Sequence, residues 1–71
     1  MNKFSVAKLK LSKWTAVSPV DKEKHFLVTA INCDTDGRIE SCVIEAVHSG
    51  RERVIDYRDL RDSDTWRMGW K

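Results

Sequence analysis

The sequence has few of the residues that build cross-links, metal sites and phosphate loops. It contains two cysteines, one proline and three glycines, and it has no Cys-x-x-Cys pair. Two cysteines do not make a disulfide framework, and no glycine-rich phosphate loop is present. The sequence therefore predicts free thiols, no metal site and no cofactor.

Long apolar runs are also absent. No stretch approaches the roughly 20 apolar residues that a membrane helix requires. The opening residues, MNKFSVAKLKLSKW, lack the continuous apolar region and the small-residue cleavage site of a secretory signal. We therefore expect a cytoplasmic protein that does not contact a membrane.

Catalytic groups are scarce as well. The candidate nucleophiles are Cys33 and Cys42, and the candidate bases are His25 and His48. The strand register derived below puts the two cysteines on opposite faces and keeps both away from a histidine on the same face. Two histidines are fewer than the three or four ligands that zinc takes, and the sequence leaves open whether they meet. We expect a protein that is not an enzyme.

The length of 71 residues indicates one small domain. A core of this size supplies about 3–5 kcal/mol of net stability, so the large apolar residues are needed first for packing. The sequence leaves open whether residues 1–8 are ordered or disordered.

The charges divide unequally along the chain. Residues 1–25 contain six lysines and two acidic residues, a net charge of +4, whereas residues 26–71 carry a net charge of −2. A basic segment is suited to a phosphate backbone or to an acidic protein surface. The alternative is a solvated face without a partner.

The middle of the chain predicts three strands. The stretches HFLVTAINC, IESCVIEAVH and RERVIDY are rich in β-branched and aromatic residues. Thr35-Asp36-Gly37 predicts a three-residue hairpin loop that pairs Asp34 with Arg38. In this register the residue numbers of paired positions add up to 72, so Val28 faces Ile44.

Ser49-Gly50 predicts a two-residue turn that pairs His48 with Arg51. In that register Ile44 faces Ile55, and Cys42 faces Tyr57. The two turns together place one apolar set on one sheet face: Phe26, Val28, Ala30, Cys42, Ile44, Ala46, Ile55 and Tyr57. This agreement predicts a three-stranded meander.

The opposite face is also largely apolar, with Leu27, Ile31, Cys33, Ile39, Val43, Val47 and Val54. A sheet apolar on both sides must be covered on both or must coil into a barrel. The two chain ends offer cover through Leu9, Leu11, Trp14, Ala16, Val17, Leu60, Trp66 and Trp70. KWTAV predicts a further strand, preceded by a bulge at Ser12-Lys13, and SPVDKEK predicts a polar loop.

We predict an all-β fold: a small, strongly bent antiparallel sheet or an SH3-like barrel of four or five strands. The tail RDLRDSDTWRMGWK has two interpretations. A short helix capped by Asp62, Ser63 or Asp64 would place Trp66 and Trp70 on one helical face. One turn followed by a short closing strand is the alternative.

Basic and aromatic residues alternate in several places, which favours recognition. Single-stranded nucleic acid binds aromatic platforms in a positive groove, and small β-barrels often provide them. The candidate binding surface consists of Lys13, Trp14, Lys22, Lys24, His25, Trp66, Arg67 and Trp70. For the tryptophans the alternative is that they belong to the core.

The stretches Ser-Lys-Trp-Thr-Ala, Lys-Glu-Lys-His-Phe and a closing Trp-x-x-Gly-Trp span residues 11–70. Together they resemble a family of short tryptophan-rich bacterial proteins. The resemblance implies a small soluble bacterial protein, and that family has no assigned biochemical function.

Two hypotheses for function follow. The first is a non-enzymatic module that binds RNA or single-stranded nucleic acid through the basic and aromatic surface. The second is a protein-interaction module, monomeric or homodimeric, that uses the second apolar sheet face.

Overall fold

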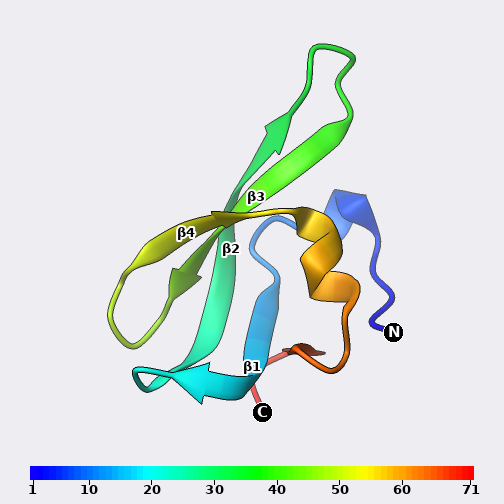
Figure 1. Cartoon of the computed structure of the whole chain (residues 1–71). Helices are drawn as coiled ribbons and strands as arrows, with labels where there is room; N and C mark the ends of the chain where they lie inside the picture. Colours follow the sequence, from blue (N-terminus) through cyan, green and yellow to red (C-terminus); the bar gives the residue numbers. More distant parts are fainter.

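The computed structural model, which describes residues 1–71, consists of one antiparallel sheet (Figure 1). Its strands are β1 (Lys13–Val20), β2 (Glu23–Cys33), β3 (Ile39–Ala46), β4 (Glu52–Ile55) and β5 (Trp66–Met68). Their order in the sheet is β4-β3-β2-β1-β5. The all-β prediction is confirmed as a strongly bent sheet of five strands, and β4 and β5 remain unpaired edges, so the sheet does not close into a barrel.

The only helical segments are short 3-10 helices, η1 (Val6–Lys8) and η2 (Tyr57–Arg61). Neither has the length or the apolar composition to cross a bilayer. Asp56 is the N-cap of η2, and its side chain accepts a hydrogen bond from the Arg58 amide. The helical interpretation of the tail is wrong: after η2 a turn leads into β5, which closes one edge of the sheet.

The first hairpin has the predicted register at both ends. Val28 faces Ile44, and Asp34 N–H donates to the Arg38 carbonyl over 2.8 Å. A bulge between Val28 and Ala30 then shifts the pairing by one residue, so Ile31 faces Cys42. The assignment of Ala30 to the core face is therefore wrong, and Ile31 packs against the core instead.

The second hairpin has a longer loop than predicted. Ala46 N–H donates to the Arg51 carbonyl, so residues 47–50 form the loop, and Cys42 faces Ile55. The register is displaced by two residues from the prediction. Because side chains alternate with period two, this displacement keeps Ile55 on the expected face. Tyr57 is no longer in the strand and lies in η2.

The entry to β1 also differs from the prediction. The phase slip arises from a tight turn before Ser12, with Leu11 at a φ of 67°, rather than from a bulge at Ser12-Lys13. Leu11 is 64% exposed and does not cover the core, whereas Leu9 is buried as expected. The SPVDKEK stretch is not one loop, because only Asp21 and Lys22 form the turn between β1 and β2.

The core lies on the face of the sheet that carries Trp14 and Phe26, hereafter the core face. Its buried members are Leu9, Trp14, Phe26, Val28, Cys42, Ile44, Ala46, Leu60 and Trp66. The N-terminal segment is held against this face, because the Asn2 side chain donates to the carbonyls of Leu60 and Trp66. The opposite side is the outer face, and it is less apolar than predicted since Ile31 and Ile39 pack toward the core.

Candidate functional site

The C-terminal tail crosses from one face of the sheet to the other. Trp66 pairs with Ala16 and is buried on the core face. Gly69 has a φ of 80°, and its amide donates to the Lys13 carbonyl over 2.8 Å. This left-handed conformation, which glycine adopts freely, redirects the chain so that the next residue lies over the outer face.

Thr15 holds the tail in place from below. Its hydroxyl donates to the Gly69 carbonyl over 2.7 Å and accepts from the Lys71 amide over 2.9 Å. Thr15 alternates with Trp14 along β1 and therefore faces outward, yet it is only 2% exposed because the tail covers it. The buried hydroxyl thus fixes the conformation of residues 69–71.

Trp70 lies on the outer face between two basic side chains. Its indole N–H donates to the Phe26 carbonyl over 3.0 Å, so the ring rests on the backbone of β2. The Lys13 ammonium is 4.8 Å from the indole centroid, and the His25 ring centroid is 5.9 Å from it. The side chain remains 43% exposed, which leaves part of an anchored aromatic ring open to a ligand.

Arg67 extends this cluster toward the sheet edge. Arg67 of β5 pairs with Thr15 of β1, and Thr15 pairs in turn with His25 of β2. The three residues therefore form one row across the outer face. Lys13, His25, Arg67 and Trp70 are hereafter the Trp70 surface. The structure therefore brings together four of the eight residues predicted as a binding surface.

The other four predicted residues lie elsewhere. Trp14 and Trp66 are 1% and 6% exposed, so the core alternative holds for both and neither offers a stacking face. Lys22 lies in the turn between β1 and β2, and Lys24 precedes His25 on β2; both are exposed. Because neighbouring strand residues point to opposite faces, Lys24 does not join the Trp70 surface.

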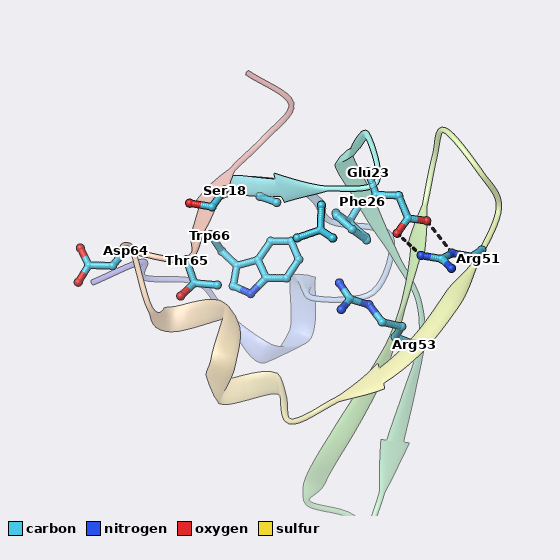
Figure 2. Close-up of a pocket in the computed structure, with 10 residues that line it drawn as sticks. Ser18, Glu23, Phe26, Arg51, Arg53, Asp64, Thr65 and Trp66 are labelled. Carbon is cyan, nitrogen blue, oxygen red and sulfur yellow. Dashed lines mark hydrogen bonds and ion pairs between the residues drawn. The ribbon is translucent and has the colours of Figure 1, made fainter.

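A cleft of about 360 Å³ opens on the core face between β1, β4 and the segment before β5 (Figure 2). Phe26 and Trp66 form its apolar wall, with their rings edge to face at 5.1 Å. The Arg53 guanidinium lies 5.4 Å from the centroid of the Phe26 ring and forms no salt bridge. This arrangement resembles that of the Trp70 surface, with a cation beside an aromatic ring.

One side of the cleft is an ion pair. Arg51 donates two hydrogen bonds to the Glu23 carboxylate, at 2.7 and 2.9 Å, and the Ser49 hydroxyl donates a further one. These hydrogen bonds, first from Arg51 and then from Ser49, lower the pKa of the Glu23 carboxyl to about 2. The pair joins Glu23 at the start of β2 to Arg51, the residue before β4. The Glu23 carboxylate already accepts hydrogen bonds from Arg51 and Ser49.

The two cysteines differ in their surroundings. Burial raises the pKa of the Cys42 thiol to about 11, which keeps it protonated and unreactive at neutral pH. Cys33 is exposed, and neither cysteine is in a disulfide. No group of three or more His, Cys, Asp or Glu side chains is placed to hold a metal ion. The His25 carbonyl accepts a hydrogen bond from the Val47 amide, the residue before His48.

Sequence reasoning missed two residues that matter here. Thr15 lies in the predicted KWTAV strand, but no local pattern identifies its hydroxyl as an anchor, because its partners Gly69 and Lys71 are 54 and 56 positions away. Arg53 is two residues before Ile55 on β4 and therefore shares the core face with it, which the strand pattern could have indicated.

Comparison with known proteins agrees with the resemblance carried by the tryptophan motifs. No curated protein and no solved structure matches the chain. Residues 12–71 match a family described as Tryptophan-rich protein (DUF2389), and the match begins at the Ser-Lys-Trp-Thr-Ala stretch. Since it extends over most of the chain, the protein belongs to this tryptophan-rich family.

Proposed function

We propose that the protein is a non-enzymatic binding module of the bacterial cytoplasm that binds single-stranded nucleic acid, RNA in particular, through the Trp70 surface. The observation that carries the proposal is the docking of Trp70. The indole is fixed by its hydrogen bond to the Phe26 carbonyl, flanked by Lys13 and His25, and 43% exposed. A fixed, half-open aromatic ring beside the Lys13 ammonium suits stacking of an unpaired base.

The side chains around Trp70 match the charge of a phosphate backbone. Lys13 and Arg67 supply two permanent positive charges next to Thr15: Lys13 is two residues before it on β1, and Arg67 faces it from β5. The Lys13 side chain is long and flexible, so a stacking base can displace its ammonium from the ring and free it for a phosphate oxygen. Neutralising phosphates releases counterions, and binding should therefore weaken steeply as salt rises.

The charges of the outer face also indicate the path that a bound nucleic acid would follow across the sheet. In the row that contains Lys13, the next residues across the sheet are Leu27, Glu45 and Glu52. The two glutamates repel phosphates at the β3 and β4 side. A nucleic acid strand should therefore follow β1 and β5 and avoid the far half of the sheet.

The test is the binding of a fluorescently labelled ten-nucleotide RNA, measured by anisotropy at low salt. Trp70→Ala should weaken binding roughly 5- to 150-fold, because a stacked base contributes about 1–3 kcal/mol. Lys13→Gln should weaken it and lower its salt dependence, whereas Lys24→Gln removes the same charge from the other face and serves as the control.

Absence of RNA binding by the unmodified protein at low salt would overturn this proposal. So would a Trp70→Ala variant that binds as well as the parent, or equal effects of Lys13→Gln and Lys24→Gln.

A second candidate function is self-association through the far half of the outer face. Val54 on the edge strand β4 is 66% exposed, and it lies beside Val43 and Ala30 in a shallow apolar depression. An edge strand with apolar neighbours can pair with a second copy. Sedimentation equilibrium tests this: Val54→Lys should reduce any dimer formation, and a monomer at all concentrations would rule the function out.

A further inference from the structure

A second cleft, separate from the one in Figure 2, lies where the N-terminal segment meets the start of β1 and the end of β5. Its volume is about 560 Å³, within the range of small-molecule sites, about 300–1,000 Å³. Phe4, Leu11 and Met68 contribute its apolar lining, and the buried Trp14 lies behind them. It is hereafter the N-terminal cleft.

The charges around the N-terminal cleft are all of one sign. Lys3, Lys8 and Lys13 line it, and no aspartate or glutamate does. None of the three lysines forms a salt bridge. Because Lys13 places its ammonium over the Trp70 ring, Lys3 and Lys8 are the cations available to a ligand in the cleft.

The core-face cleft differs on this point. Its two arginines, Arg51 and Arg53, are balanced by Glu23 and Asp64. Of these two clefts, the N-terminal cleft is therefore the one in which an anion would experience a net attraction.

The rim of the N-terminal cleft contains a leucine in an unusual conformation. Leu11 has a φ of 67°, a left-handed conformation that branched, bulky residues rarely adopt. Its amide is held by a 2.7 Å hydrogen bond to the Val28 carbonyl. The side chain is 64% exposed, so packing in the core does not explain the conformation. Strained backbone of this kind is concentrated at ligand sites.

Met68 completes the apolar rim at 44% exposure. The cleft thus combines exposed apolar walls with unpaired cations and no negative charge. A ligand that satisfies both features has an apolar body and one anionic group.

We propose that the N-terminal cleft binds a small amphipathic anion, an aliphatic chain or aromatic ring that bears one carboxylate. The apolar body lies against Leu11, Met68 and Phe4, and the carboxylate is held by Lys3 and Lys8. Lys13 is common to this cleft and the Trp70 surface, but its ammonium lies over the Trp70 ring, and the proposed carboxylate contacts are with Lys3 and Lys8.

The two methionines of the chain allow a direct test with octanoate as the probe. In protein labelled with ¹³C at the methionine methyl groups, octanoate should shift the Met68 signal. Met1 is 81% exposed and does not line the cleft, so its signal is the internal control. Lengthening the chain from hexanoate to octanoate to decanoate should tighten binding roughly three- to fourfold per methylene.

Two further probes separate the apolar and anionic contributions. Acetate at the same concentration should leave Met68 unshifted, because it lacks the apolar body. Octanol should bind several-fold more weakly than octanoate, because it lacks the charge. An equal response to octanol and octanoate would overturn the proposal.

Matched variants locate the charge. Replacing Lys3 and Lys8 together by glutamine should weaken octanoate binding roughly fivefold. Replacing Lys22 and Lys24 by glutamine removes the same charge away from the cleft and should change nothing. Leu11→Gly relieves the left-handed strain and keeps the fold, so weaker octanoate binding in a more stable protein is the expected result.

The outcome for this site is distinct from that for RNA binding. Trp70→Ala should retain the octanoate response while losing RNA affinity. No Met68 shift at millimolar octanoate would refute the carboxylate site and would leave the RNA experiment unaffected.

Discussion

The two tryptophans of the C-terminal tail, Trp66 and Trp70, are four residues apart and lie on opposite faces of the sheet. Trp66 is 6% exposed and packs edge to face on Phe26 in the core. Trp70 is 43% exposed and rests on the outer face against Lys13 and His25. The same residue type therefore stabilises the core at position 66 and forms part of the exposed surface at position 70.

The difference arises from two residues, Gly69 between the tryptophans and Thr15 in the strand beneath the tail. In a regular strand, residues four apart would share a face. Gly69 interrupts the alternation with its left-handed φ of 80°, and the Thr15 hydroxyl fixes the redirected chain. A tail of this design can place one large aromatic residue in a small core and keep another available to a ligand.

The largest expected effect tests the structural half of the comparison. Trp66→Ala should lose about 3–5 kcal/mol, because it removes a buried aromatic ring and leaves a cavity. That is the whole net stability expected of so small a core, so the variant should be largely unfolded by circular dichroism. Trp66→Phe should fold with reduced stability and unchanged RNA binding. Similar denaturation midpoints for Trp66→Ala and Trp70→Ala would break the comparison.

Removal of the anchor should have the next largest effect. Thr15→Val keeps the shape of the side chain but leaves the Gly69 carbonyl and the Lys71 amide without their partner, at a cost of about 1–3 kcal/mol. Trp70 should become more accessible to acrylamide, and RNA affinity should fall. Thr29→Val is the control, because the hydrogen bonds of that hydroxyl are long, at 3.4 and 3.5 Å. An unchanged Trp70 environment in Thr15→Val would show that the hydroxyl is not the anchor.

A smaller effect should follow from Gly69→Ala. The new methyl group would meet no atom closer than 4.0 Å, so the cost comes from the backbone alone, about 1–2 kcal/mol for a left-handed alanine. The indole N–H signal of Trp70 in a ¹H–¹⁵N spectrum should move, because its bond to the Phe26 carbonyl depends on this turn. The Trp66 signal should stay in place; movement of both signals would mean that the two faces are coupled.

The smallest expected effect is on the pH dependence of the free energy of unfolding, and it concerns the Glu23–Arg51 ion pair of the cleft on the core face. Folding lowers the pKa of Glu23 from 4.5 to about 2, so the unfolded state binds more protons between these values. The stabilisation is complete above about pH 4.5 and disappears as the pH falls toward 2. Urea denaturation across this range should show a shallower pH dependence for Glu23→Gln. The remaining slope should come from Asp56, whose pKa is also lowered to about 2 by hydrogen bonds from Arg58. Equal slopes in parent and variant would exclude a contribution of Glu23.

Much of the sheet could be predicted because it depends on local signals. The Asp34–Arg38 pairing followed from a turn with glycine at its left-handed position, and Gly37 has a φ of 79° there. The second loop was predicted to be two residues long and has four, residues 47–50, which displaces the strand register by two residues. Because side chains alternate with a period of two, the predicted faces of β4 were still correct. The bulge after Val28 could not be predicted, since no residue in that stretch requires one.

The candidate site was predictable only in part. The alternation of basic and aromatic residues identified Lys13, His25, Arg67 and Trp70, but it also selected Trp14 and Trp66, which are buried. Composition does not distinguish a core tryptophan from a surface one. Lys22 and Lys24 are close in sequence to His25 yet lie outside the cluster. Lys22 lies in the turn before β2, and Lys24 is a strand neighbour of His25 and therefore points to the opposite face.

The sequence by itself determined that the chain forms strands, where the first hairpin turns, and that the tryptophan motifs mark one family, because propensity, turn chemistry and motif spacing are local properties. The tertiary structure alone decided which tryptophan is buried and which is presented. That outcome depends on a hydrogen bond between Thr15 and Gly69, which are 54 positions apart, and on the backbone of Phe26 beneath the Trp70 ring. Contacts between distant residues form only when the whole sheet is assembled, and no local pattern encodes them.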